Sequence, residues 1–173
     1  MRAALGAVAG PDPPAWEYLL SHHLPDRYRR TLRVRVGGRL VHLCARCTGQ
    51  VLGLTAWFVV FVTVRPASVA LFAWPAEVVW AVLPAAAAGD WLAQSLDRRE
   101  STNGRRLVTG ALLGAALANL LALAVTGRIE LFLVGVGVLA GYVVTLAAIL
   151  RWTGAWRSVL EQHFPGIDLG PVS

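Results

Sequence analysis

Four long apolar segments dominate the hydrophobic pattern of the chain. They run from Thr48 to Val64, from about Ala76 to Gln94, from Leu107 to Val125 and from Ile129 to Leu150. A helix needs roughly 20 mostly apolar residues to cross the hydrocarbon core of a bilayer. The pattern therefore predicts an all-α membrane protein with four transmembrane helices.

Polar residues are concentrated between these segments, and the arginines among them are unevenly distributed. With four spans, the N-terminal segment, the middle loop and the C-terminal tail lie on one side of the membrane and hold 14 of the 16 arginines. Cytoplasmic loops of membrane proteins carry such an excess of basic residues. The distribution predicts that both termini are cytoplasmic. The composition agrees, because 56% hydrophobic and 15% charged residues make the chain more apolar than an ordinary soluble domain.

Three parts follow from this pattern: a cytoplasmic Arg-rich cap at residues 1–43, a transmembrane domain at 44–150 and a cytoplasmic tail at 151–173. Within the cap, residues 33–41 alternate around a Gly-Gly pair, which predicts a small β-hairpin. We expect the arginines of the cap to meet anionic head groups of the lipid bilayer. No aromatic-rich recognition motif accompanies them, so no nucleic-acid partner is expected.

Small residues recur at four-residue spacing within three of the predicted spans. Glycine pairs of this kind let helices approach closely in lipid, within one chain or between copies in a homo-oligomer. Spans one and three are expected to touch, which would bring their cytoplasmic ends together. The pairs are Gly49 and Gly53, Gly110 and Gly114, and Gly137 and Gly141.

Histidines and cysteines gather just before the first span, as His22, His23, His42, Cys44 and Cys47. Thiolates and neutral imidazoles are the ligands of a tetrahedral zinc site, so the group predicts a zinc site. If a helix begins at Cys44, the three-residue spacing places both cysteines on one face of it. Two alternatives stay open: reactive thiols whose pKa is lowered by a helix N-terminus, and simple structural packing.

A second polar group lies at the junction of spans two and three. Asp90 and Gln94 are four residues apart and share a helix face, while Asn103, Arg106 and Thr109 recur at three-residue spacing. Ionisable groups at such depth in a membrane protein often mark a functional site.

The alternative for this junction is an ordinary cytoplasmic turn between two helices. Ser101 or Thr102 would then cap the third helix, and Arg98, Arg99 and Arg105 would meet lipid head groups.

Together, these spaced residues resemble a bacterial and archaeal family of small membrane proteins, known as domain of unknown function 2085. The elements that carry the resemblance are residues 21–27, Cys44 to Gly49, Asp90 to Gln94, and Glu100 to Arg106 followed by Thr109-Gly110. The resemblance implies a bacterial or archaeal cytoplasmic membrane protein with a polar site, and it implies no established activity. Ser21 stands where the family has cysteine, so a set of three cysteines and one histidine is complete only if His23, His42 or water contributes.

The combined prediction is a cytoplasm-facing polar pocket that binds a metal or an anionic group, with phosphate-bearing lipid as the first class to test. Its members are His22, Cys44, Arg46, Cys47, Asp90, Gln94, Asn103 and Arg106. Arg46, Gln94, Asn103 and Arg106 would bind the substrate, and Asp90 with Arg106 would be catalytic if the protein is an enzyme. Whether it is an enzyme stays open. The alternatives are a small oligomeric carrier or channel and a membrane scaffold or assembly factor.

Overall fold

A computed structural model describes residues 19–21, 25–64, 76–96, 98 and 100–163 of the chain. The chain divides into two compact units, residues 1–44 and residues 45–173.

The first unit contains the predicted β-hairpin. A 3-10 helix, η1 (Pro25–Arg30), leads into β1 (Thr31–Val36), which pairs antiparallel with β2 (Arg39–Cys44). The turn consists of Gly37 and Gly38, whose φ angles of 55° and 79° are left-handed. Two consecutive left-handed residues form the type of turn that matches the twist of a hairpin, which explains the Gly-Gly pair. The hairpin prediction is confirmed, and the strands are longer than the alternation at residues 33–41 indicated.

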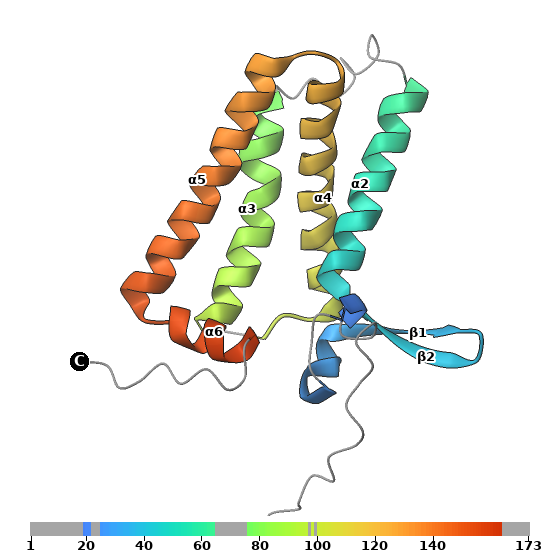
Figure 1. Ribbon diagram of the computed structural model, residues 1–173, viewed down its shortest axis with the longest axis vertical. Helices are drawn as coiled ribbons and strands as arrows, with labels where there is room; N and C mark the ends of the chain where they lie inside the picture. Colours follow the sequence, from blue (N-terminus) through green and yellow to red (C-terminus); the bar gives the residue numbers. More distant parts are fainter. Residues whose placement is uncertain (1–18, 22–24, 65–75, 97, 99, 164–173) are drawn as a thin grey trace, which may run out of the picture. The chain divides into compact units, whose positions relative to one another are not determined.

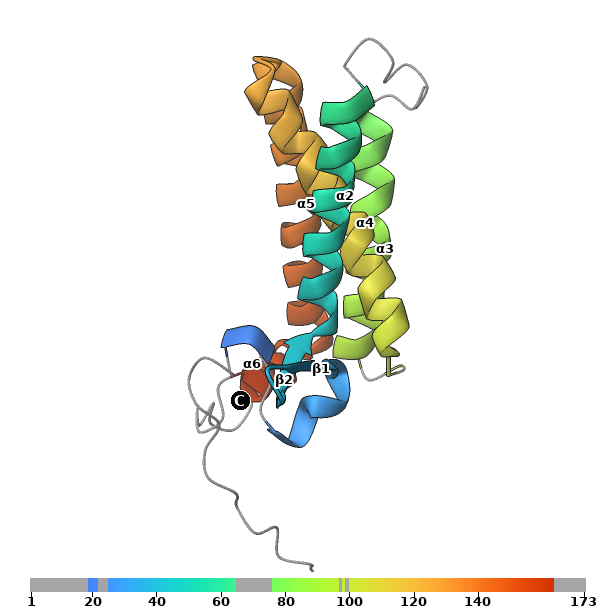
Figure 2. The same ribbon diagram turned by 90° about the vertical axis from the view of Figure 1, so that its right-hand side faces the viewer.

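The second unit consists of four long helices and one short helix (Figure 1). They are α2 (Ala45–Val64), α3 (Ala76–Ser95), α4 (Asn103–Val125), α5 (Ile129–Thr153) and α6 (Trp156–His163). The four long helices run alongside one another in both views (Figures 1 and 2). The short connections from α3 to α4 and from α4 to α5 make neighbouring helices antiparallel. The short helix α6 lies in a part of the sequence that was predicted only as a tail.

Each predicted span corresponds to one long helix, but the number of helices that qualify as membrane spans differs. Within the described residues, three are long and apolar enough to cross a membrane: Ala45–Thr63, Asn103–Val125 and Ile129–Thr153. The α3 helix has 20 residues but is not one of the three, and it carries Asp90, Gln94 and Pro84. The structure thus supports a membrane protein with several apolar helices.

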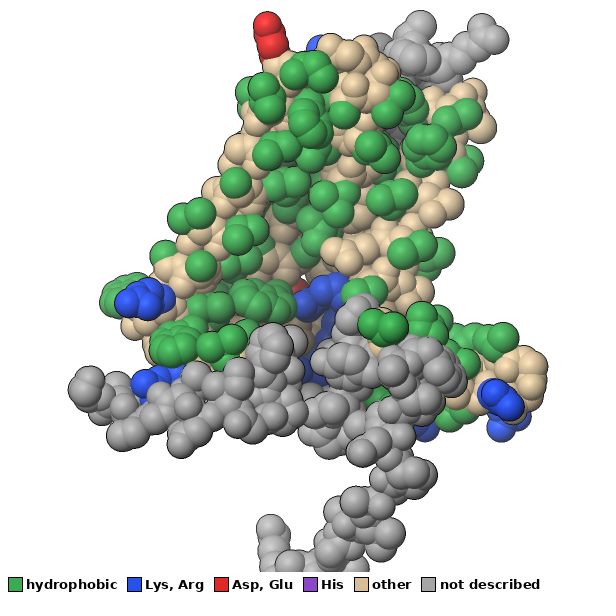
Figure 3. Space-filling model, in the orientation of Figure 1, with side chains coloured by type: hydrophobic (Ala, Val, Ile, Leu, Met, Phe, Trp, Pro, Cys, Tyr) green, Lys and Arg blue, Asp and Glu red, His purple; other side chains and the backbone are tan. Residues whose placement is uncertain are grey.

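Hydrophobic side chains are spread over the face of the helices that Figure 3 shows. Val59 on α2 is 52% exposed, and Val143 and Val144 on α5 are each 67% exposed. Many exposed apolar side chains are unfavourable in water and are what membrane-spanning helices present to lipid.

Glycines bring α2 and α4 into backbone contact. A Cβ atom built on Gly49 or Gly53 would collide with the carbonyl oxygen of Leu107 or Ala111. The reverse holds on α4, where Gly110 and Gly114 lie against the carbonyl oxygens of Arg46 and Gln50. The expected contact between the first and third predicted spans is therefore present, since only residues without a side chain permit this approach.

The bundle interior contains an apolar core around Trp80. Its ring is fully buried and packs with Leu120 and Leu123, and it also limits the space beside Gly135. Trp80 falls near the start of α3, where a tryptophan of a membrane protein often anchors at the lipid interface. Its complete burial shows that it is instead part of the packing between α3, α4 and α5.

Candidate functional site

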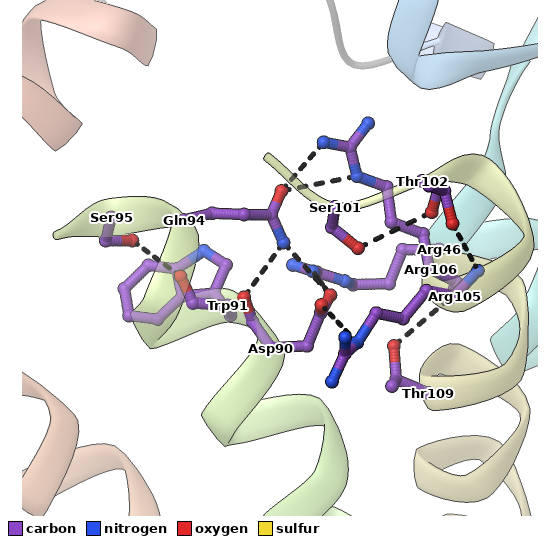
Figure 4. Close-up of polar contacts among 10 residues, drawn as sticks. All are labelled: Arg46, Asp90, Trp91, Gln94, Ser95, Ser101, Thr102, Arg105, Arg106 and Thr109. Atoms are coloured by element: carbon purple, nitrogen blue, oxygen red, sulfur yellow. Dashed lines mark hydrogen bonds and ion pairs between the residues drawn. The ribbon is translucent and has the colours of Figure 1, made fainter. Parts of the chain in front are cut away.

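Asp90 is the centre of a polar cluster at one end of the helical unit (Figure 4). Its side chain is 1% exposed, and Oδ2 accepts a hydrogen bond of 2.7 Å from Nη2 of Arg46. Nε of Arg105 lies 3.2 Å from Oδ1 and forms a second ion pair. That contact is close but not aligned as a hydrogen bond, since Oδ1 has no hydrogen-bond partner among the described residues. A buried carboxylate requires such compensation, because an isolated charge loses its hydration there.

Gln94 links Asp90 to a third arginine. It lies one turn after Asp90 on α3, and its Nε2 donates to the Asp90 backbone oxygen at 2.9 Å and to Oδ2 at 3.0 Å. Its Oε1 accepts from Nη2 and Nε of Arg106, at 2.8 and 3.2 Å. The two ends of one amide therefore bind a carboxylate and a guanidinium, which fixes the orientation of the amide. We call Arg46, Asp90, Gln94, Arg105 and Arg106 the arginine cluster.

Three helix ends position the arginine cluster. Arg46 is the second residue of α2, Asp90 and Gln94 lie in the last turns of α3, and Arg105 and Arg106 lie in the first turn of α4. The α4 helix begins there because the side chain of Thr102 accepts a hydrogen bond from the backbone N–H of Arg105. Ser, Thr, Asp and Asn are the residues that cap helices in this way.

The glycine contact joins the ends of α2 and α4. Gly110 lies one turn after Arg106 and touches the backbone carbonyl of Arg46. This close approach brings the first turn of α2 beside the first two turns of α4. Thr109 supports the same turn, because its hydroxyl donates to the carbonyl oxygen of the buried Arg106 at 3.3 Å.

The structure brings together four of the residues predicted for the pocket: Arg46, Asp90, Gln94 and Arg106. Asn103 is the half-buried first residue of α4, and none of the contacts above involves it. The fifth member, Arg105, was predicted only as an arginine that meets lipid head groups. The only sequence signal for Arg105 was its position next to Arg106 at the start of a helix. Helical periodicity places neighbouring residues on different faces, so this signal did not predict that both would join one cluster.

The two cysteines do not share a helix face. Cys44 is the last residue of β2 and is buried, whereas α2 begins at Ala45 and contains Cys47. The condition that a helix starts at Cys44 is therefore wrong, because backbone pairing with Thr31 keeps Cys44 in the hairpin. Both thiols are free of disulfide bonds.

Of the three histidines predicted as metal ligands, the structure describes His42. His42 is buried, and its ring stacks on that of Tyr28 with centroids 4.0 Å apart. His22 and His23 lie outside the described residues. In the described part of the chain, no three His, Cys, Asp or Glu side chains are grouped so that they could hold a metal ion. The zinc site stays a prediction.

A family model described as "predicted membrane protein", domain of unknown function 2085, matches residues 25–120. The chain belongs to this family. The match covers more than half of the sequence, from η1 to most of α4, and includes every member of the arginine cluster. No curated protein and no solved structure matches the chain. The family assignment therefore identifies a predicted membrane protein and names no activity.

Proposed function

We propose that the arginine cluster binds a phosphate-bearing anionic group at the membrane surface, with phospholipid head groups as the class of ligand. The observation that carries the proposal is an excess of positive charge. Arg46 and Arg105 share a single carboxylate, that of Asp90, and Arg106 lies beside them on the amide oxygen of Gln94. Residues 90–106 and Arg46 together contain five arginines and three acidic residues. Guanidinium groups bind phosphate oxygens with paired hydrogen bonds, so an anion of this type would complete the balance.

The exposure of the side chains supports a division of roles within the cluster. The Asp90 side chain is 1% exposed, whereas those of Arg46 and Arg105 are 21% and 48% exposed. Nε of Arg46 is buried and has no hydrogen-bond partner within the described segments. The carboxylate thus serves as an internal anchor that positions two guanidinium groups, and these retain surface for an external ligand.

The position at helix ends also favours an anion. Arg105 and Arg106 lie in the first turn of α4, where unpaired backbone N–H groups and the helix dipole stabilise negative charge. Because α2 and α4 are candidate membrane spans, their first turns lie at the depth of lipid phosphates when the helices cross a bilayer.

Our proposed setting is a bacterial or archaeal cytoplasmic membrane, with α3 crossing it together with the three apolar helices. Four crossings place 14 of 16 arginines on one side, which is the cytoplasmic side under the positive-inside rule. The arginine cluster would then face the cytoplasm, with both chain termini on the same side.

The geometry favours a positioning role for Asp90 over a role as general base. Oδ2 accepts from Arg46 and Gln94, and Oδ1 lies beside Arg105 in a side chain that is only 1% exposed, so a substrate has little access to either oxygen. A catalytic role for Asp90 and Arg106 stays a prediction. A carrier or a scaffold stays an alternative, and proteoliposome flux would distinguish a carrier.

The test is binding of short-chain lipids to the purified protein in detergent. Dioctanoyl phosphatidylglycerol should bind more tightly than dioctanoyl phosphatidylcholine, whose head group carries no net charge. Arg105→Gln should weaken binding roughly 10- to 100-fold, the value of one lost hydrogen bond to a charged group. Arg105 suits the test because its side chain is half exposed and its replacement leaves Asp90 paired with Arg46.

Arg151→Gln provides the matched control, since Arg151 is exposed in the last turn of α5 and is not a member of the cluster. Equal affinity of Arg105→Gln and the unaltered protein would refute the proposal. Metal analysis of the same preparation tests the zinc prediction, and a preparation without stoichiometric metal would contradict it.

A further inference from the structure

The β1–β2 hairpin has two chemically different faces. In an antiparallel pair, residues opposite each other point to the same face, and the faces alternate along each strand. Leu32 is opposite Leu43, and Val34 is opposite Val41, so these four side chains share one face. The complete faces are Leu32, Val34, Val36, Arg39, Val41 and Leu43 on one side, and Thr31, Arg33, Arg35, Leu40, His42 and Cys44 on the other.

The first of these, which we call the apolar face, is exposed near its tip. Val34 is 38% exposed and Val36 is 62% exposed, although valine is a residue that folded proteins usually bury. Arg39 is the one charged member of this face and lies opposite Val36, next to the turn. A long arginine side chain at that position can reach away from an apolar surface to a polar one.

The other end of the hairpin is anchored. The Thr31 hydroxyl donates to the backbone oxygen of Tyr28 at 2.6 Å, and the Tyr28 ring stacks on His42. Thr31, His42 and Cys44 are buried. The root of the hairpin is thus fixed to the preceding turn, while apolar and basic side chains near its tip are exposed.

We propose that this hairpin lies in the interfacial layer of the membrane, with the apolar face toward the acyl chains and its arginines on anionic head groups. Two observations favour lipid as the partner that covers the apolar face. The segment from residue 31 to residue 44 contains three arginines and no acidic residue, so its charge complements an anionic surface. Cys44 ends β2 and Ala45 begins α2, so the hairpin directly precedes a candidate membrane span in the sequence.

The hairpin site is separate from the arginine cluster and does not depend on the proposed function. The hairpin would recognise the membrane surface, through insertion of apolar side chains and attraction between charges, and would not recognise a single head group. An amphipathic element of this kind binds through its buried apolar area and through attraction to anionic lipids. Replacing Arg33 and Arg35 with glutamine should therefore shift the hairpin from the docked to the undocked state by roughly thirty-fold, at about one kcal/mol for each arginine.

The experiment measures the depth of one position on each face in proteoliposomes. Val36→Cys and Arg33→Cys are prepared separately in a chain that carries Cys44→Ala and Cys47→Ala, and each is labelled with an environment-sensitive fluorophore. In vesicles of phosphatidylcholine with phosphatidylglycerol, the label at 36 should be quenched by lipids brominated in the acyl chain and protected from iodide. The label at 33 should show the reverse. Equal iodide quenching at positions 36 and 33 would overturn the proposal. That result is also expected if a protein partner, and not lipid, covers the apolar face.

A measurement on the unaltered chain guards against loss of folding in the cysteine-free variant. Arg33, Arg35 and Arg39 are exposed and can be cleaved by trypsin. Cleavage after these residues should be several-fold slower in nanodiscs that contain phosphatidylglycerol than in nanodiscs of phosphatidylcholine alone. Equal rates in the two lipid compositions would also refute the proposal. Failure of lipid binding at the arginine cluster would leave both readouts unchanged, so the two proposals are distinguished.

Discussion

The backbone contact between α2 and α4 leads to a specific prediction about the glycines of α2 and α5. In Gly53→Ala, the new Cβ atom would lie 2.6 Å from the carbonyl carbon and 2.7 Å from the Cα of Ala111, and it would collide with the carbonyl oxygen. Ordinary contacts of a Cβ atom begin at 3.4 Å. Since the obstacle is backbone, the two helices must separate, by about 1 Å, for the methyl group to fit.

The control for this change is Gly141→Ala on α5, where no atom lies within 4 Å of the new Cβ atom. Both substitutions gain about 0.5–1 kcal/mol because alanine is the better helix former. That gain is common to the pair, so their difference reports the cost of overpacking, about 1–3 kcal/mol. We therefore expect Gly141→Ala to be neutral or stabilising and Gly53→Ala to be clearly less stable than it.

The assay is equilibrium unfolding of the purified protein in mixed micelles, with helix content followed by circular dichroism as the denaturing detergent increases. The free energy of unfolding of each variant is compared with that of the unaltered chain. Equal values for the two alanine variants would show that α2 and α4 are not in backbone contact. That result would also remove the reason for placing Arg46 beside the first turn of α4.

Three further predictions concern single polar side chains and use the same unfolding assay. Asp90→Asn should lower stability by about 1–3 kcal/mol, less than for a fully buried pair because Arg46 and Arg105 are partly exposed. Glu130→Gln, at an exposed position of α5, should change it by less than about 0.5 kcal/mol, and an equal loss would contradict the anchor role of Asp90. Asn119→Leu should raise stability by about 1 kcal/mol, because the Asn119 side-chain oxygen is buried without a partner in the described residues; a loss would mean that the oxygen is bound. Thr102→Ala should cost about 1 kcal/mol through loss of the cap of α4, and Thr102→Ser should retain the cap, so similar losses would exclude capping.

The local pattern of the sequence determined the elements of this protein. The lengths of the apolar segments predicted the positions of α2, α3, α4 and α5 to within a few residues. A long apolar segment in a membrane must satisfy its backbone hydrogen bonds internally, and a helix does so. Alternation around Gly37 and Gly38 predicted the hairpin, since only residues that tolerate left-handed backbone suit that turn.

Tertiary structure alone decided which of these residues meet. The contact between Arg46 and Asp90 spans 44 positions in the chain, and no periodicity identifies such a pair. Arg105 and Arg106 both belong to the cluster, although only Arg106 was predicted for it, because Arg105 lies beside the Asp90 carboxylate and Arg106 binds Gln94. Cys44 became a strand residue through its pairing with Thr31, and Trp80 became core through contacts with α4 and α5. Local propensity acts over a few residues, whereas these outcomes depend on how separate elements pack.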